Sequence, residues 1–337
     1  MTSSSPIVIV GAGVLGLSTA FELHRRGRAV LVVDPGGVNA SLVAAGMIAP
    51  AMESAIDDVS LDRAQLFRAG RDLWSEFASA AGIALACRPA EWRGGDVGAM
   101  EARLRALGFD ARRDGASVMI DDDYQVEPAQ ALAALRQALA KAVVAGTATA
   151  IVRTDGGWRL EVGDQWLDAE AVVLATGAWD AIAGLPETAR RLIAEIQPIR
   201  GQIGVAAGHL VDHVVRGPGA YVAPMASGAA IGATMEPGRR DTAPDAEASE
   251  RLTQAAWAML GRSPKPLAIE WGVGIRGATA DGLPLAGAAL GEEGLFLALA
   301  PRRNGWLLGP LVGAVVADAI EGRTASPHAR ALDPGRF

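Results

Sequence analysis

The sequence predicts an α/β protein in which a doubly wound, mostly parallel sheet is interleaved with an α+β domain built on a mostly antiparallel sheet. Three observations predict it. Residues 6–34 have the pattern of a strand, a helix and a second strand, and further buried strands of parallel type recur in the middle and near the end of the chain. Between them, residues 196–233 contain strand-length pieces separated by Gly and Pro, which is typical of an antiparallel sheet. With 337 residues, half of them hydrophobic, the chain is long enough for about two domains.

The first elements follow from changes in hydrophobic period. The β-branched run 6–10 is bounded by glycine and predicts a buried parallel strand, and helical spacing then runs from Val14 to about Gly27. A second buried strand covers 29–34 and is stopped by a Pro-Gly-Gly turn. A helix is predicted over 62–81.

The later elements are shorter. A helix rich in Ala, Leu, Arg and Gln is predicted over 127–144, with Pro128 in its first turn. We expect short strands near 147–152, 158–162, 169–175 and 295–300, and helices over 249–260 and 305–321. Residues 87–124 show no dominant period and end in Asp121-Asp122-Asp123, which we interpret as a solvated turn.

The order of these elements divides the chain into two interleaved domains. The parallel-sheet domain is predicted to comprise residues 1–80, 124–192 and 277–337. The second domain is predicted to comprise residues 81–123 and 193–276.

Composition excludes several classes of function. Lys plus Arg total 31 against 38 for Asp plus Glu, a net charge of −7, which argues against nucleic acid or an anionic membrane as the main partner, although a local basic patch remains compatible. The single cysteine, Cys87, excludes an intramolecular disulfide and a Cys-rich metal site, and we predict no metal. The apolar run 7–21 is too short to span a bilayer and no Lys or Arg precedes it, so we expect a cytoplasmic protein that is not integral to a membrane.

The first motif is G-x-G-x-x-G, formed by Gly11, Gly13 and Gly16 between the first strand and the first helix. Such glycines allow a tight turn and let backbone N–H groups approach a pyrophosphate at the helix N-terminus. Asp34, followed by Pro35, ends the second strand at the spacing expected of a ribose-binding acid. The pattern predicts a dinucleotide site and disfavours NADP, but it does not separate NAD from FAD. The alternative is a glycine-rich turn that serves helix–strand packing alone.

Three later segments favour FAD. The strand 171–175 breaks at Thr176-Gly177 before Trp179, and the small-residue loop 41–50 would let a flat ring lie against the backbone. The run 302–308 opens the last predicted helix, whose N-terminus would place positive charge near a flavin ring.

On these motifs the sequence resembles the D-amino-acid oxidase superfamily of flavoproteins, and within it glycine oxidases of the thiamine-biosynthesis type. The resemblance implies a Rossmann-like, three-layer FAD-binding domain of glutathione-reductase type beside a substrate-binding domain. It covers nearly the whole chain and rests on these pieces in order: GAGVLGLSTAFEL (11–23), ASLVAAGMIAP (40–50), VEP (126–128), ATGAW (175–179), PIRGQ (198–202), YVAP (221–224), IGATMEP (231–237), GIRGATADGLPLAG (274–287) and RRNGWLLGP (302–310).

The resemblance also implies site residues. FAD contacts fall on the glycine motif and on Val14, Leu15, Asp34, Pro35, Ser41, Ala45, Gly46, Met47, Thr149, Thr176, Gly177, Trp179, Arg302, Arg303, Asn304, Gly305, Trp306 and Leu307. The substrate-facing residues implied are Arg276, Tyr221, Met235 and Arg303. No cysteine follows Cys87, so we expect FAD to be bound without a covalent bond through a C-terminal cysteine.

The sequence departs from the family pattern in three places. Ala300-Pro301-Arg302 stands where relatives have Gly-His-aromatic, Gly277 replaces a proline, and the stretch 87–124 is short.

The residue types fit amino-acid oxidation. A guanidinium matches both oxygens of a carboxylate, so Arg276 is the predicted substrate clamp, the alternative being a structural pair with an acid such as Asp281. Tyr221 is either a hydroxyl at that carboxylate or an ordinary sheet aromatic, and Met235 either lines the pocket or fills the core. Arg303, at a helix start, needs an anionic partner, which flavin or substrate oxygens would supply.

We therefore predict FAD-dependent oxidative deamination of a small amino acid or amine (glycine, sarcosine or a small D-amino acid). A hydride passes from Cα to flavin N5, the imine is hydrolysed to the oxo acid, and O2 is reduced to H2O2. The alternatives are a D-amino-acid dehydrogenase with another electron acceptor, a non-catalytic flavin-binding subunit of an oxidase, and a nicotinamide dehydrogenase. The sequence leaves open the exact substrate and whether the protein forms a homo-oligomer.

Overall fold

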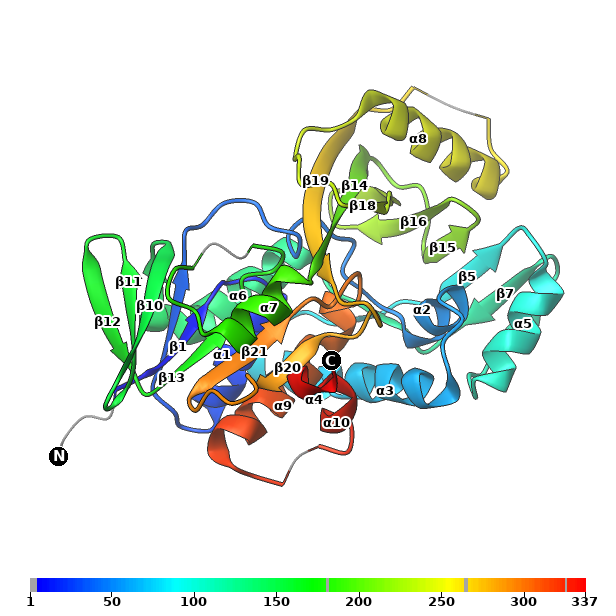
Figure 1. Ribbon diagram of the computed structural model, residues 1–337. Helices are drawn as coiled ribbons and strands as arrows, with labels where there is room; N and C mark the ends of the chain where they lie inside the picture. Colours follow the sequence, from blue (N-terminus) through cyan, green and yellow to red (C-terminus); the bar gives the residue numbers. More distant parts are fainter. Residues whose placement is uncertain (1–4, 180–181, 264–265, 325) are drawn as a thin grey trace.

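The computed structural model describes residues 5–179, 182–263, 266–324 and 326–337. Its centre is a six-stranded sheet in the order β20-β21-β13-β1-β2-β9 (Figure 1). The strands β1 (Ile7–Val10), β2 (Val30–Asp34), β9 (Val143–Ala145), β13 (Ala171–Leu174) and β21 (Leu295–Leu299) are parallel, and β20 (Leu285–Ala288) joins antiparallel at the edge. The predicted α/β fold with an interleaved antiparallel part is confirmed.

Both faces of this sheet are covered, which makes three layers. On one face Ile7 and Ile9 pack in a core with α1 (Val14–Arg25), α6 (Pro128–Leu139) and α9 (Gly305–Glu321). On the other face Val8 and Val10 pack against a three-stranded sheet of β10 (Ala148–Thr154), β11 (Gly157–Val162) and β12 (Gln165–Ala169). Alternate residues of one strand thus enter opposite cores, which explains why β1 is apolar throughout.

A nine-stranded sheet carries the other half of the molecule. Its order is β18-β14-β17-β16-β15-β5-β7-β6, with β19 paired to β14. The strands are β5 (Ala90–Arg93), β6 (Arg112–Asp114), β7 (Ser117–Ile120), β14 (Gln197–Ala207), β15 (Val214–Gly217), β16 (Ala220–Met225), β17 (Gly228–Gly232), β18 (Glu236–Pro237) and β19 (Ile269–Ala278). All their pairings are antiparallel except that of β5 with β15. The helix α8 (Ala246–Leu260) covers one face through Leu252, Ala256 and Trp257 (Figure 1).

The remaining elements connect these layers. They are the strands β3 (Met47–Ile48), β4 (Ala86–Cys87) and β8 (Tyr124–Gln125), which form a small sheet, and the helices α2 (Pro50–Ile56), α3 (Leu61–Asp72), α4 (Trp74–Ala81), α5 (Val97–Ala106), α7 (Glu187–Ala194) and α10 (Ala329–Leu332). Single turns of 3₁₀ helix cover Ala140–Ala142 and Pro334–Arg336. None of the helices in the described part of the chain is long and apolar enough to cross a membrane.

The division into domains stays a prediction. The nine-stranded sheet draws its strands from residues 90–120 and 197–278, and the six-stranded sheet from residues 7–34, 143–174 and 285–299.

Two predicted helices need correction, and one observed strand was not predicted. The helix expected over 127–144 ends at Leu139, because Ala140 takes a positive φ of 26° and the β-branched Val143 and Val144 join the six-stranded sheet as β9. The helix expected over 62–81 is two helices that meet at Leu73. Residues 165–169 form β12, a strand that the sequence analysis did not include.

Candidate functional site

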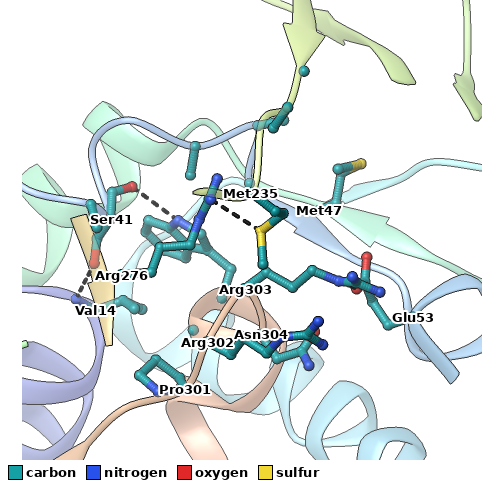
Figure 2. Close-up of a pocket in the computed structure, with 18 of the residues that line it drawn as sticks. Val14, Ser41, Met47, Glu53, Met235, Arg276, Pro301, Arg302, Arg303 and Asn304 are labelled. Carbon is teal, nitrogen blue, oxygen red and sulfur yellow. Dashed lines mark hydrogen bonds and ion pairs between the residues drawn. The ribbon is translucent and has the colours of Figure 1, made fainter. Parts of the chain in front are cut away.

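A cavity of about 350 Å³ lies where the two large sheets meet. Its wall is made by the N-terminal ends of α1 and α9, by the loop 40–47, and by residues of β15, β16 and β19 (Figure 2). Sixteen of the predicted site residues line it: Gly13, Val14, Leu15, Ser41, Ala45, Gly46, Met47, Gly177, Tyr221, Met235, Arg276, Arg302, Arg303, Asn304, Gly305 and Trp306. Residues far apart in sequence therefore form one site.

The three glycines of the motif lie in two different environments: two are tightly packed in a turn, and one faces the cavity. A Cβ on Gly11, whose φ is +109°, would lie 2.4 Å from the Ala175 carbonyl oxygen, and one on Gly16 would lie 2.0 Å from the Gly11 oxygen. These two glycines close the turn between β1 and α1. Gly13 instead borders the cavity, where a Cβ would meet only Ser41 Oγ at 3.2 Å. Gly11 and Gly16 thus serve packing, whereas Gly13 is the glycine of the motif that a dinucleotide in the cavity could approach.

The N-termini of α1 and α9 reach the same cavity because the two helices pack closely. A Cβ on Gly309 of α9 would lie 3.0 Å from Ser18 Oγ, and one on Gly313 would lie 2.8 Å from the Ser18 carbonyl oxygen. Glycine at both positions permits this approach. The first N–H groups of a helix lack intrahelical partners and carry partial positive charge, so the cavity receives two such ends.

Asp34 is held at the end of β2 beside the glycine turn. Its carboxylate accepts hydrogen bonds from Ala12 N at 2.7 Å, Gly36 N at 2.9 Å and Arg136 Nη2 at 3.1 Å. Neither Asp34 nor Pro35 lines the cavity. Binding of ribose by Asp34 stays a prediction.

The small-residue loop is tied to both helix ends. Ser41 Oγ accepts from Val14 N at 2.9 Å, and the Ser41 carbonyl accepts from Trp306 Nε1 at 3.0 Å. Gly46 has a φ of +67°, and a Cβ there would lie 1.9 Å from the Val126 oxygen. The loop therefore needs glycine at 46, and its residues 40, 41 and 44–47 line the cavity, while their contact with a flat ring stays a prediction.

Besides Gly11, Gly16, Asp34 and Pro35, four further predicted FAD contacts lie away from the cavity wall. Thr149 is exposed on β10, where its hydroxyl donates to Glu161 Oε2 at 2.7 Å. Thr176 Oγ1 donates to the Trp179 carbonyl at 2.7 Å, and the Trp179 side chain is exposed. Leu307 is buried in the core beneath α9. Their contact with FAD stays a prediction.

Arg276 points into the cavity from β19 without an acidic partner (Figure 2). Its Nη1 donates to the Thr234 carbonyl at 3.2 Å and contacts Met235 Sδ at 3.3 Å. Asp281, the alternative partner, binds Arg336 instead, at 2.9 Å. No carboxylate of the described residues lies within ion-pair distance of Arg276. Burial lowers the pKa of this guanidinium, and the nearby charges of Arg303 and Arg302 add to the effect.

Tyr221 and Met235 also line the cavity. The Tyr221 ring lies over Gly232, where a Cβ would come within 2.4 Å of the hydroxyl oxygen. Burial raises the pKa of Tyr221, so its hydroxyl keeps a proton to donate. Met235 lies between Arg276 and Arg303 in Figure 2, so it borders the pocket and does not fill the core.

Arg303 has a partner different from the one expected. Its guanidinium pairs with Glu53 of α2 and with Asp57 Oδ1 at 3.1 Å, so the anion at this helix start comes from the protein. Glu53 also accepts from Arg216 Nη1 at 2.6 Å, and Arg302 Nη1 donates to Asp57 Oδ2 at 2.6 Å. Burial raises the pKa of Glu53, but Arg303 and Arg216 outweigh it and hold the value at about 2. Glu53 and Arg216 lie outside the residues that the motifs predict for the site, because no motif marks either of them.

Asp123 corrects the expectation of a solvated turn at 121–123. Asp121 and Asp122 are exposed, but Asp123 is only 1% exposed and both of its carboxylate oxygens lack a hydrogen-bond partner among the described residues. Burial raises the pKa of Asp123 well above its usual value. The turn is solvated on one side and packed on the other.

The cavity wall fits FAD. The N-terminus of α1 would offer N–H donors to phosphate oxygens, with Gly13 leaving room beside it, and the N-terminus of α9 would place positive charge near the flavin ring. Asn304, before the first turn of α9, is 2% exposed, and its Oδ1 has no partner among the described residues. An unpaired buried oxygen of this kind suits a donor on a polar ring.

Comparison with known proteins gives concordant results. Residues 6–319 match the DAO family, described as "FAD dependent oxidoreductase". Glycine oxidase of Geobacillus kaustophilus is 31% identical over 95% of this chain and 94% of that protein. The bifunctional protein ThiO/ThiG of Synechocystis is 28% identical over the whole of this chain and 55% of that protein. The crystal structure of glycine oxidase from Geobacillus kaustophilus superposes with a TM-score of 0.84 at 26% identity, covering 98% of both chains.

Proposed function

Because the chain belongs to the DAO family of FAD-dependent oxidoreductases, we propose that it is an oxidase of glycine, sarcosine or a small D-amino acid. The overall reaction converts the amino acid to an imino acid, which water hydrolyses to the oxo acid and ammonia, or to the oxo acid and methylamine where the substrate is sarcosine. The two electrons pass to O2, which becomes H2O2. An FAD-dependent amino-acid oxidase-like enzyme is what the family and its relatives show, and the substrate and the acceptor are our proposal.

The observation that carries this proposal is the buried guanidinium of Arg276. A buried cation without a counter-ion is unfavourable because it has lost its hydration. A carboxylate that binds beside it supplies the missing counter-ion, and this attraction contributes to the free energy of binding. The planar fork of arginine matches the two oxygens of a carboxylate. A substrate that carries a carboxylate, such as an α-amino acid, fits this wall of the cavity better than a simple amine.

The residues around the cavity bind and orient such a substrate. Arg276 holds the carboxylate, and the protonated Tyr221 hydroxyl is available to donate a second hydrogen bond to it. FAD, when bound, supplies the hydride acceptor. Two fixed donors on one carboxylate restrict its rotation and so fix where Cα lies, which is the contribution of positioning to rate.

The wall opposite the clamp bears on the charge of the substrate side chain. On that side Glu53 pairs with both Arg216 and Arg303, and Asp57 also pairs with Arg303, so each of these arginines has a carboxylate partner. A substrate side chain therefore meets no free charge there. The remaining space next to Tyr221 is bounded by backbone and small residues such as Gly219 and Ala220.

The test is anaerobic reduction of the purified protein with a panel of glycine, sarcosine, D-alanine, D-proline and larger D-amino acids. We expect bleaching of the visible flavin band by the small members, and peroxide on admission of air. Bleaching without peroxide would replace the oxidase by a dehydrogenase with another acceptor. No bleaching by any amino acid would instead favour a non-catalytic flavin-binding subunit, against which the presence of both Arg276 and Tyr221 in the cavity argues.

A further inference from the structure

Arg276 has no acidic partner among the described residues, and other features fix the direction of its guanidinium. One is the backbone of the neighbouring strand β14. In the register of β14 and β19, Arg276 lies opposite Ile199, and its side chain extends across Gly201. A Cβ on Gly201 would lie 1.9 Å from Arg276 Nη1 and 2.3 Å from Cζ. The guanidinium therefore lies against the bare backbone of residue 201, and any side chain there would displace it.

The second feature is a segment that we call the strap, residues 234–245, which runs from the end of β17 through β18 to the start of α8. Its first two residues contact the clamp directly: the Thr234 carbonyl accepts from Arg276 Nη1 at 3.2 Å, and Met235 Sδ lies 3.3 Å from the same nitrogen. The position of the strap thus decides where Nη1 can lie.

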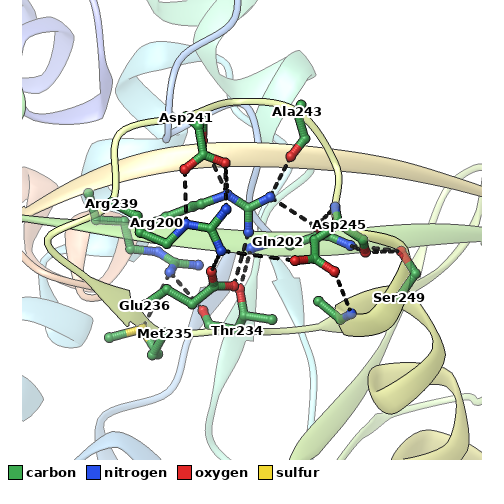
Figure 3. A network of polar contacts seen from close by, with 12 residues as sticks. Arg200, Gln202, Thr234, Met235, Glu236, Arg239, Asp241, Ala243, Asp245 and Ser249 are labelled. Carbon is green, nitrogen blue, oxygen red and sulfur yellow. Dashed lines mark hydrogen bonds and ion pairs between the residues drawn. The ribbon is translucent and has the colours of Figure 1, made fainter.

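Arg200 fixes the middle of the strap to β14 (Figure 3). Its side chain is fully buried. Nη1 donates to Glu236 Oε1 at 3.0 Å, Nε donates to the Asp241 carbonyl at 3.1 Å, and Nη2 donates to the Ala243 carbonyl. One guanidinium therefore holds three points of the strap, which an ammonium could not do in the same geometry.

Gln202 fixes both ends of the strap (Figure 3). Its backbone N donates to Thr234 Oγ1 at 2.9 Å, and its side-chain oxygen accepts from Asp245 N at 2.7 Å. Its Nε2 donates to the Asp245 carbonyl at 3.0 Å and to Ser249 Oγ at 2.8 Å. Arg200 and Gln202 point to one face of β14 and Gly201 to the other, because successive side chains of a strand alternate.

We propose that Gly201, Arg200 and Gln202 are positioning residues for the carboxylate clamp. Gly201 leaves the space in which the Arg276 guanidinium lies, and the other two hold the strap whose Thr234 carbonyl and Met235 sulfur direct it. This inference rests on the proposed function, in which Arg276 binds the substrate carboxylate. Three consecutive residues of β14 then fix the position of the Arg276 guanidinium, Gly201 directly and the other two through the strap.

The first variant to test is Gly201→Ala in the FAD-loaded protein. We expect FAD to be retained and the KM for the best amino acid of the panel to rise about tenfold or more, since the methyl group occupies the place of Nη1. The matched control is Gly272→Ala on β19, where a Cβ would meet Val43 Cγ1 at 3.4 Å, an ordinary contact. Acetate, a carboxylate without an amine, provides a readout besides turnover: its perturbation of the flavin spectrum should require a correspondingly higher concentration in Gly201→Ala.

The second variant is Arg200→Lys, with Arg239→Lys as its control. Arg239 pairs with the same two acids, Glu236 and Asp241, but it lies on the surface and holds no strap carbonyl. We expect Arg200→Lys to weaken acetate and amino-acid binding and Arg239→Lys to leave both unchanged.

The outcomes separate the two proposals. If the wild-type protein is bleached by no amino acid, the proposed function fails. If amino acids bleach it and Arg276→Ala weakens their binding, but Gly201→Ala and Arg200→Lys bind acetate as the wild type does, the positioning proposal is wrong and the function stands. Loss of FAD or of folding in both variants, with both controls intact, would also overturn it, because the residues would then hold the sheet and not the clamp.

Discussion

Replacing Arg276 by alanine is the sharpest test of the proposed carboxylate clamp. In the structure the guanidinium is buried and contacts a carbonyl and a thioether, neither of which carries charge. Removing one partner of a desolvated charge pair costs about 2–5 kcal/mol, so the apparent dissociation constant of an amino acid should rise about 30-fold to several-thousand-fold. Arg276→Lys should recover only part of this loss, because an ammonium cannot form two parallel hydrogen bonds.

Although Arg276→Ala should weaken substrate binding, we do not expect it to lower the stability of the fold. Alanine at 276 leaves no described carboxylate unpaired, because Asp281 is bound to Arg336 and Glu53 to Arg216 and Arg303. Removing a buried charge without a counter-ion relieves its desolvation penalty, which offsets the packing lost with the side chain. The free energy of unfolding of Arg276→Ala in urea should therefore equal or exceed that of the wild type.

The assay is an anaerobic titration of flavin bleaching beside the urea curve. Weak binding with an unchanged flavin spectrum and undiminished stability supports the clamp. Expulsion of FAD or a loss of several kcal/mol of stability would assign Arg276 a structural role. Unchanged amino-acid binding would remove the basis for choosing an amino acid over a simple amine.

Three further predictions concern the cofactor and a buried acid. Acid precipitation should release FAD into the supernatant, since no cysteine follows Cys87, and colour kept in the pellet would refute this. Asp34→Ala should weaken FAD by roughly 1.5–3 kcal/mol through loss of a charged acceptor, and unchanged FAD occupancy would exclude Asp34 from the site. The raised pKa of Asp123 means that its contribution to stability is present below the unfolded pKa and is lost as pH rises toward the folded value. As pH rises over that range, Asp123→Asn should therefore gain stability relative to the wild type, by up to about 1.4 kcal/mol per pH unit. The control Asp121→Asn, at an exposed position, should show no such gain. A constant difference in the free energy of unfolding between Asp123→Asn and the wild type across pH would contradict this.

The sequence predicted an element correctly where its hydrophobic period and the residues at its two ends indicate the same bounds. The last helix was expected over 305–321 and is observed over the same residues, since Asn304 precedes it and Gly322 ends it in a left-handed conformation. The first strand and helix also appear as predicted, because both faces of β1 are buried and the glycine turn fixes where α1 starts. Errors arose where tertiary pairing decides. No Gly or Pro separates residues 143–145 from the helix before them, yet they complete the edge of a sheet beside β2.

The candidate site divides in the same way. Its cavity-lining glycines and small loop residues were predictable because backbone approach demands them, and they carry motifs. Gly201, Arg200 and Gln202 lie within the quoted motif PIRGQ, but nothing in one sequence shows that Arg200 reaches a strap some 40 residues later. Asp123 was misjudged because neighbouring acidic residues usually share a solvated surface, and only packing shows that this one is turned inward.

Glu53 was beyond sequence reasoning because its partners are distant, 163 residues away at Arg216 and 250 residues away at Arg303. Glu53 and Asp57 are four residues apart, and helical spacing turns both toward the Arg302-Arg303 pair. Their charges determine which arginines of the cavity have a carboxylate partner. Of the four arginines that line it in the described part of the chain, three have a carboxylate within ion-pair distance, and Arg276 does not. Arg303, expected from its helix position to pair with a ligand anion, is already paired with Glu53 and Asp57, which leaves Arg276 as the lining arginine of the described residues without a carboxylate partner.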